Sequence, residues 1–219
     1  MCLIVLAWRV HPDFPLVVAA NRDEFHARPA ARAAFWDDHP QILAGRDLEA
    51  RGTWMGVSRA GKFAAVTNYR GGTEPRAIES RGALVSRFLA NGASPGEYMS
   101  NLKADLYSGF NLLAADGEEL WWTSNRGGKP RRLDPGIYGL GNALLDAPEV
   151  DGIKKAFAAD LETGAAVESL FSLLHQARIL NPQYGTRCST VLLKGKRIRY
   201  AERAFAADGT EDDTAHFEF

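Results

Sequence analysis

The first nine residues of the chain limit its possible folds more than any other stretch. From Cys2 to Trp8 the side chains are apolar on both alternating faces, and Pro12 follows shortly after. A short run rich in Ile, Val and Leu with a turn residue beyond its end is typical of a strand that is covered on both sides. A chain terminus frays unless other elements hold it. We therefore expect Cys2 to be held rigidly at the start of a central strand.

The position of Cys2 directly after Met1 has a chemical use. Removal of Met1 would leave Cys2 with both a thiol and a free α-amine. An α-amine has a reference pKa of about 7.7–8.0 and can act as a base near neutral pH, whereas a thiolate is a strong nucleophile. Nucleophile and base would then belong to one residue. The alternative is that Cys2 is a small buried hydrophobic residue, as free cysteines often are.

The composition narrows the function classes. With 219 residues, 46% hydrophobic and 24% charged, the chain can form one well-packed domain over 1–219. A net charge of −1 without a long basic block disfavours nucleic acid as a partner. No apolar run reaches the roughly 20 residues of a membrane helix, and no targeting segment is recognised. We therefore expect a cytoplasmic protein without a membrane span, while the oligomeric state stays open.

Metal and cofactor motifs are not recognised in the sequence. Two cysteines do not indicate a disulfide framework. No cysteines and histidines have the spacing of a zinc site, and there is no Gly-rich phosphate loop. We therefore expect neither a metal nor a cofactor.

Hydrophobic periodicity and turn residues predict groups of strands that alternate with helices. The predicted strands are 2–8, 16–20, 53–58, 63–68, 110–115, 120–124, 137–141, 187–193 and 196–203. The predicted helices are 80–90, 95–106, 149–161 and 167–177. We expect a long surface excursion over 26–50, a flexible loop over 69–75 and an acidic tail. Several hairpins with helices between them are typical of antiparallel sheets with helices on their outer faces, and the predicted fold class is α+β.

Polar residues stand where several predicted strands begin or end, and these are the candidate site. They are Cys2, the run Asn21-Arg22-Asp23-Glu24, Asn68, Asn142 and Arg187. Each type also has a structural explanation, because asparagine tolerates turns and arginine forms surface ion pairs of little energetic consequence. Cys188, beside Arg187, is expected to be buried in the core.

Together these residues resemble the NRDE family, which is also called the transport and Golgi organisation protein 2 family. The resemblance rests first on the Met-Cys start and on the Asn-Arg-Asp-Glu run at 21–24. Further matching motifs are Gly45-Arg46-Asp47, Gly52-Thr53-Trp54-Met55-Gly56-Val57, Asn68-Tyr69-Arg70, Ser80-Arg81-Gly82 and Gly141-Asn142-Ala143. The resemblance implies a fold related to N-terminal nucleophile hydrolases, a four-layer αββα sandwich of two mainly antiparallel sheets. It does not imply one settled reaction.

A more distant likeness, to choloylglycine hydrolases and penicillin V acylases, implies roles for individual residues. These amide-cleaving enzymes also start Met-Cys, and their second strand ends in Arg-Asn-x-Asp. The pattern matches Asn21 and Asp23 here, but Ala20 stands in the place of the arginine. Arg22, shifted by two positions, or Arg187 is then the candidate that lowers the pKa of the thiol.

The same likeness implies that Cys2 is the nucleophile and that Asp23 orients its α-amine. Asn68 would complete an oxyanion hole, and Asn142 would position the amine or the substrate. We therefore expect Cys2, Asp23, Asn68 and Asn142 to meet at one end of the sheet sandwich.

Functions of three classes remain open from the sequence. The first is an N-terminal cysteine hydrolase that cleaves a C–N amide bond of a small acylated molecule. The second is a non-catalytic carrier of an apolar anionic ligand, because family members have been linked to haem trafficking and to lipid or acyl-CoA handling. No Cys-x-x-Cys-His motif or histidine pair supports haem. The third, a structural or interaction protein, is disfavoured by the polar residues at the strand ends.

Overall fold

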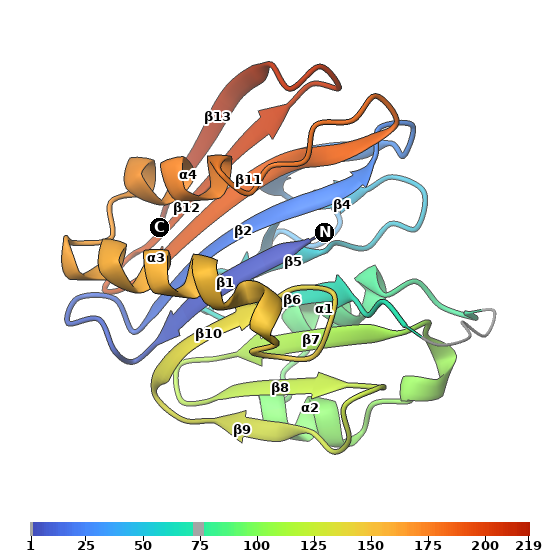
Figure 1. Cartoon of the computed structure of the whole chain (residues 1–219). Helices are drawn as coiled ribbons and strands as arrows, with labels where there is room; N and C mark the ends of the chain where they lie inside the picture. The colour runs from blue at the N-terminus through green and yellow to red at the C-terminus, as the bar shows by residue number, and fades with distance from the viewer. Residues whose placement is uncertain (1, 72–76) are drawn as a thin grey trace. The chain divides into compact units, whose positions relative to one another are not determined.

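The computed structural model describes residues 2–71 and 77–219 (Figure 1). These residues form two compact units. Unit 1 comprises the described residues of Met1–Arg28, Pro135–Gly141 and Leu145–Phe219. Unit 2 comprises those of Pro29–Asp134 and Asn142–Leu144. Each unit is therefore built from separate stretches of the chain. A single domain over the whole chain stays a prediction.

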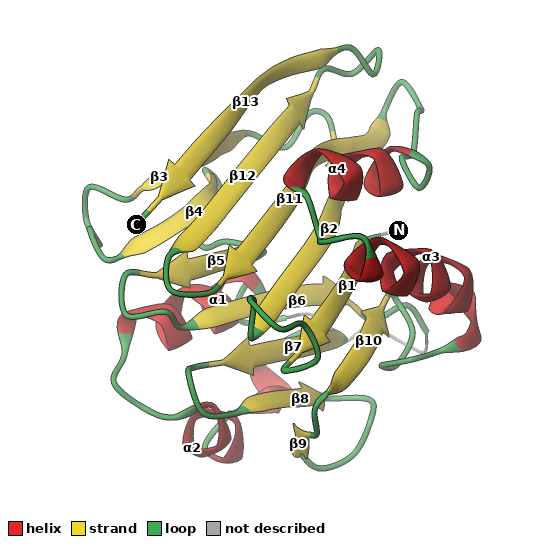
Figure 2. Cartoon of the chain, turned by 90° about the vertical axis from the view of Figure 1, so that its left-hand side faces the viewer, coloured by secondary structure: helices red, strands yellow, loops and turns green. Residues whose placement is uncertain are grey.

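Unit 1 is built on a six-stranded antiparallel sheet with the order β10-β1-β2-β11-β12-β13. Its strands are β1 (Leu3–Trp8), β2 (Leu16–Phe25), β10 (Gly136–Leu140), β11 (Tyr184–Lys194), β12 (Ile198–Phe205) and β13 (Glu211–Glu218). Two helices, α3 (Asp151–Glu162) and α4 (Val167–His175), pack on one face, with the 3-10 helix η2 (Pro148–Val150) before α3. Figure 2 shows α4 over β2 and β11, and α3 contacts β1 and β10.

The N-terminal strand is held as the sequence predicts. β1 lies between β10 and β2, and all six of its side chains are buried. Val5 and Ala7 belong to a hydrophobic cluster that also contains Phe157 of α3 and Phe171 of α4. Leu3 pairs with Asn21 of β2 and Ile4 pairs with Leu140 of β10, so the strand is held from both sides soon after Cys2.

Unit 2 is built on a seven-stranded antiparallel sheet with the order β3-β4-β5-β6-β7-β8-β9. Its strands are β3 (Ala30–Phe35), β4 (Ile42–Asp47), β5 (Met55–Ser58), β6 (Phe63–Asn68), β7 (Phe110–Ala115), β8 (Leu120–Ser124) and β9 (Arg131–Leu133). The helical elements are α1 (Gly82–Ala90), α2 (Pro95–Ser100) and the 3-10 helix η1 (Ala104–Leu106). Helix α1 contacts β4, β5, β6 and β7, whereas α2 contacts β8.

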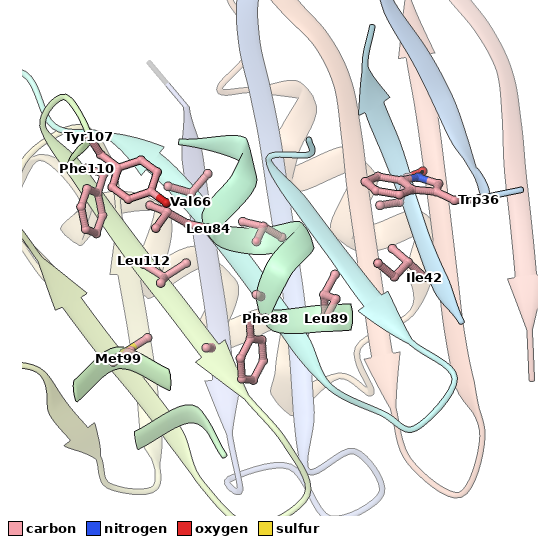
Figure 3. Packing of buried hydrophobic residues seen from close by; sticks show 14 residues of the cluster. Trp36, Ile42, Val66, Leu84, Phe88, Leu89, Met99, Tyr107, Phe110 and Leu112 are labelled. Atoms are coloured by element: carbon pink, nitrogen blue, oxygen red, sulfur yellow. Dashed lines mark hydrogen bonds between the residues drawn. The ribbon is translucent and has the colours of Figure 1, made fainter. Parts of the chain in front are cut away.

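The apolar face of α1 forms the centre of the unit 2 core. Leu84, Phe88 and Leu89 are buried in one cluster with Val66 and Leu112, and Figure 3 shows these side chains. Their spacing at i, i+4 and i+5 is the helical periodicity from which the sequence predicts this helix.

Glycines of the family motifs allow close packing in unit 2. A Cβ atom on Gly45 would overlap the ring of Trp54. A Cβ on Gly52 would lie 2.5 Å from the carbonyl carbon of Gly82, and Thr53 N donates to Gly82 O over 3.3 Å. Close packing therefore explains the glycines at these motif positions, and no catalytic role is needed.

Both sheets are antiparallel and both carry helices, which confirms the α+β class. The predicted hairpins over 53–68 and 110–124 are confirmed, and so are the helix pair after residue 149 and the helix that ends before Asn91. The predicted helix over 95–106 is wrong in its second half, because α2 ends at Ser100 and η1 follows. Tyr69–Gly71 is a loop, and the remainder of the predicted flexible loop, 72–75, lies outside the described residues.

Three further predictions about the strands are wrong. The second strand does not stop before Asn21, because β11 pairs with β2 as far as Phe25 and supplies backbone partners beyond the apolar part. Residues 26–50 are not a surface excursion but contain β3 and β4, whose alanines and charges hide the alternation. The acidic tail is the edge strand β13, where Arg197 and Arg199 pair with Glu218 at 3.4 and 3.7 Å. The short strand β9 was not predicted from the sequence.

Within residues 2–71 and 77–219, none of the helices combines the length and apolar character that crossing a membrane requires.

Candidate active site

Cys2 lies directly before β1, and its thiol contacts the end of β2. Cys2 Sγ donates to the backbone oxygen of Asp23 over 3.4 Å. The register of the two strands pairs Leu3 with Asn21, and one further step places Cys2 opposite Arg22. The side chain of Cys2 is half-buried. The thiol therefore contacts the β2 backbone in a residue that is not completely buried.

The environment of Cys2 favours the neutral thiol. Burial raises the pKa of Cys2, and the negative charge of Asp23 raises it further. The hydrogen bond to the Asp23 backbone and the positive charge of Arg22 lower the pKa of Cys2, but the net direction is upward. The expected lowering by Arg22 is present and is outweighed by burial. A reaction at this thiol therefore needs a base that takes its proton.

Asp23 is a buried carboxylate whose orientation is set by β11. It is 3% exposed and pairs in register with Thr186. Thr186 Oγ1 donates to Asp23 Oδ1 over 2.6 Å and accepts from the backbone N–H of Ile179 over 2.9 Å. Because the hydroxyl has a fixed donor of its own, its proton points at the carboxylate.

Tyr184 is a second residue of β11 at this place. Its hydroxyl donates to Asp23 O over 3.3 Å, the same oxygen that receives the Cys2 thiol. The ring of Tyr184 packs edge-on against Phe25, with 5.3 Å between the ring centroids. Sequence reasoning missed both Tyr184 and Thr186, because nothing in their local pattern indicates that they pair with the polar end of β2. The one available signal was that Tyr184 and Thr186 lie two residues apart, directly before the predicted strand 187–193, as two side chains on the same face of a strand would.

The two candidate arginines of unit 1 do different things. Arg22 is 6% exposed, pairs in register with Cys188, and its Nη2 lies 3.9 Å from Glu24 Oε2. Arg187 Nη1 donates to the backbone oxygens of Phe25, His26 and Arg28 over 3.0, 3.3 and 3.1 Å. Arg22 therefore lies in the row of side chains that includes Cys2, whereas Arg187 holds the turn after β2.

The remaining candidates, Asn68 and Asn142, meet in unit 2. Asn68 is the exposed last residue of β6, and Asn142 is buried in the segment Asn142–Leu144. Asn142 Nδ2 donates to Asn68 O over 2.6 Å, and Asn142 O accepts from the backbone N–H of Arg70 over 2.7 Å. Because a carbonyl oxygen only accepts, the bond to Asn68 identifies the nitrogen end of the amide. In the part of the chain that the structure describes, Asn142 Oδ1 has no hydrogen-bond partner.

The candidates therefore form two groups. Cys2, Arg22 and Asp23 are neighbours in unit 1, and Asn68 and Asn142 are bonded to each other in unit 2. That the two groups form one site stays a prediction. Over residues 2–71 and 77–219, His, Cys, Asp and Glu side chains form no group of three or more that could hold a metal ion.

Solved structures share this fold. The Caenorhabditis elegans N-acylethanolamine-hydrolyzing acid amidase ortholog matches with a TM-score of 0.59 at 12% identity, over 88% of this chain and 92% of its own. A mutant of conjugated bile acid hydrolase from Clostridium perfringens matches with a TM-score of 0.58 at 10% identity, over 99% and 97%. Penicillin V acylase from Agrobacterium tumefaciens matches with 0.53 at 15% identity, over 93% and 83%. These likenesses define a protein with the N-terminal nucleophile hydrolase-like fold, as expected.

Sequence comparison gives the family within this class. The Transport and Golgi organization protein 2 homolog of Bos taurus is 35% identical over 100% of this chain and 99% of its own length. The human homolog is 40% identical over 68% of this chain and 59% of its own length. The family model of Transport and Golgi organisation 2 matches residues 1–183. The chain belongs to the Transport and Golgi organisation 2 family.

Proposed function

We propose that this protein is an N-terminal cysteine hydrolase that cleaves the C–N amide bond of a small acylated molecule. One observation carries the proposal: the Cys2 thiol bonds to the backbone of Asp23, whose buried carboxylate is oriented by Thr186. A thiol and a carboxylate are thus held together at the start of a buried strand, where an α-amine at residue 2 would complete a nucleophile, a base and an orienting group.

In the proposed reaction the α-amine of Cys2, free after removal of Met1, takes the thiol proton. The Sγ electron pair attacks the amide carbon of the substrate and forms a C–S bond, while the carbonyl oxygen becomes an oxyanion. The ammonium returns its proton to the amide nitrogen as the C–N bond breaks, and an amine leaves. Water, deprotonated by the α-amine, then attacks the thioester. The C–S bond breaks, the ammonium returns its proton to the leaving sulfur, and the carboxylic acid is released with the thiol and the amine restored.

Asn68 and Asn142 have separate parts in this proposal. The exposed side-chain amide of Asn68 would donate to the oxyanion, and such a donor stabilises the transition state by about 2.7–4 kcal/mol. Asn142 has its Nδ2 engaged by Asn68 O, so its Oδ1 is the atom that could accept from the ammonium or from a substrate N–H. The proposal requires that both side chains reach the Cys2 thiol.

Arg22 and Asp23 act on the nucleophile itself. The positive charge of Arg22 opposes the rise in the pKa of Cys2 and would stabilise the thiolate as it forms. The Asp23 carboxylate would hold the ammonium after proton transfer. Arg187 would act indirectly, through the turn that follows β2.

The names of the structural relatives support acyl amides as the substrate class, because they are an amidase, an acylase and a bile acid hydrolase. The curated sequence relatives are instead named for transport and Golgi organisation. These names state no hydrolase activity, and the second candidate is the one that the family resemblance implies, a carrier of an apolar anionic ligand such as haem or an acyl-CoA that uses the same fold without chemistry.

The state of residue 2 separates the two candidates. Intact mass of the protein from its native host is expected to show a chain that begins at Cys2. The wild type is expected to hydrolyse members of a panel of N-acyl amines and to form a thioester adduct visible by mass. Cys2→Ala should abolish both, and Cys188→Ala is the matched control that retains them. A retained Met1, or turnover unchanged in Cys2→Ala, would reject the hydrolase and leave the carrier.

A further inference from the structure

A fully buried asparagine in unit 2 lies next to both of its candidate site residues. Asn111 is 0% exposed on β7 and pairs in register with Thr67 on β6. Asn111 Nδ2 donates to Thr67 Oγ1 over 3.2 Å and to the backbone oxygen of Ala143 over 2.9 Å. Since the Ala143 oxygen can only accept, this bond identifies which end of the Asn111 amide carries the protons.

The other end of the Asn111 amide is unusual for a protein core. Asn111 Oδ1 is buried and makes no hydrogen bond to any of the described residues. A buried amide oxygen without a partner lowers stability, and an apolar side chain of similar shape would avoid that loss. Its register partners on either side, Thr67 of β6 and Ser124 of β8, are buried as well, so solvent does not reach this oxygen across the sheet. A polar side chain at this position therefore calls for a role other than packing.

The two bonds of Asn111 join the residue before Asn68 to the residue after Asn142. Asn142 in turn donates to Asn68 O and accepts from the Arg70 amide. Three hydrogen bonds thus hold Asn142 and Ala143 against the ends of β6 and β7. Only the bond from Asn111 comes from a side chain that is itself completely buried and held by a strand.

We infer that Asn111 is a positioning residue that docks the segment Asn142–Leu144 on the sheet and so holds the Asn68–Asn142 pair in place. Its effect on turnover rests on the proposed function, whereas its effect on docking does not. Asn111 needs no contact with a substrate, because it acts through the bond to Ala143.

Hydrogen exchange of two adjacent backbone amides tests the docking directly. The Arg70 amide donates to Asn142 O, whereas the Tyr69 amide donates to Gly109 O over 2.9 Å. In Asn111→Leu the protection of the Arg70 amide is expected to fall about tenfold, and that of Tyr69 should stay as in the wild type. Thr67→Val is the matched control, because it removes the other partner of Asn111 and leaves the bond to Ala143. In this variant the Arg70 and Tyr69 amides should both keep their wild-type protection. If Asn111→Leu does not fold, Asn111→Ala is measured in its place.

An Arg70 amide that stays fully protected in the folded variant would overturn the inference. Equal losses at Tyr69 and Arg70 would overturn it as well, because they would report a general weakening of β6 and β7.

A double-mutant cycle tests the consequence for turnover. Asn111→Leu is expected to lower kcat about tenfold with KM unchanged, and Asn142→Ala combined with it should be no slower than Asn142→Ala alone. Additive losses would show that Asn111 does not act through Asn142. If the wild type hydrolyses no acyl amide, the proposed function fails, and the exchange of the Arg70 amide still decides the inference.

Discussion

The Thr186 hydroxyl donates a hydrogen bond to Asp23 Oδ1 over 2.6 Å, between partners that are 163 residues apart in the chain. Both side chains are buried, and the same hydroxyl accepts from the Ile179 amide. The orientation of the proposed carboxylate therefore depends on β11 rather than on its own strand.

Replacing this hydroxyl should impair both stability and turnover. In Thr186→Val a buried carboxylate oxygen loses its donor, and we expect the free energy of unfolding to fall by about 1–3 kcal/mol. Hydrolysis should slow about tenfold, because Asp23 is no longer held. Denaturant unfolding and kcat measure the two effects. Thr186→Ser keeps the hydroxyl and should retain most of the wild-type stability and kcat. A Thr186→Val variant with wild-type stability and kcat would contradict the role of Thr186 in orienting Asp23.

The two cysteines should differ in reactivity. Cys2 is half-buried and Cys188 is buried, and burial raises the pKa of both thiols. Brief treatment with an alkylating reagent should modify Cys2 first, at a rate that increases with pH as the thiolate fraction grows. Peptide mass spectrometry identifies the modified residue, with Cys2→Ala as the control. Faster modification of Cys188 would be inconsistent with this structure.

Alkaline pH should destabilise the fold through Cys188. Burial and the charge of Glu202 raise the pKa of Cys188 well above its ordinary value of 9.0. Above pH 9 the unfolded chain releases this proton while the folded chain keeps it, so the free energy of unfolding falls as pH rises. The slope per group is at most about 1.4 kcal/mol per pH unit. Urea unfolding from pH 7 to 10.5 should show a shallower decline for Cys188→Ala, and parallel curves would refute the assignment.

Tyr200 should contribute to the same decline at higher pH. Burial raises its pKa well above 10.0, with the charge of Glu202 as a further cause. In Tyr200→Phe the fall in stability above pH 10 should therefore be smaller than in the wild type. No difference above pH 10 would show that the phenol ionises normally in the folded chain.

Two glycines should respond to alanine in opposite directions. A Cβ on Gly45 would overlap the Trp54 ring, whereas a Cβ on Gly152 in the first turn of α3 meets no atom within 4 Å. We expect Gly45→Ala to lower the free energy of unfolding by about 1–3 kcal/mol. Gly152→Ala should raise it by about 0.4–1 kcal/mol, because alanine restricts the unfolded chain. Thermal or urea unfolding of both variants checks the pair, and a stable Gly45→Ala would refute the packing argument.

Local pattern was enough to predict the elements with strong hydrophobic periodicity. β1, the hairpin of β5 and β6, and α1 all carry apolar side chains at the spacing of their own secondary structure. β3, β4 and β13 were not predicted, because alanines and charged residues interrupt the alternation of apolar side chains in these segments. Arg46 of β4 stacks over Trp36 at 4.2 Å and pairs with Asp38, and Glu218 of β13 pairs with Arg199.

The residues of the candidate site also differ in whether the sequence could predict them. Cys2, Asp23, Asn68 and Asn142 were found from strand ends and from the family resemblance. Tyr184, Thr186 and Asn111 were not found, because each bonds to a residue at least 32 positions away in the sequence. Which strand lies beside the polar end of β2 is a property of the folded sheet, and no local pattern expresses it.

The pairing of β2 with β11 also sets a time order during synthesis. A ribosome adds about 5–20 residues per second, so Thr186 follows Asp23 by roughly 10–30 s. Until then β2 lacks its partner β11, and the Asp23 carboxylate lacks the hydroxyl that orients it. The proposed nucleophile would thus be among the first residues made, whereas the strand that orients the carboxylate beside it comes only when synthesis is almost finished.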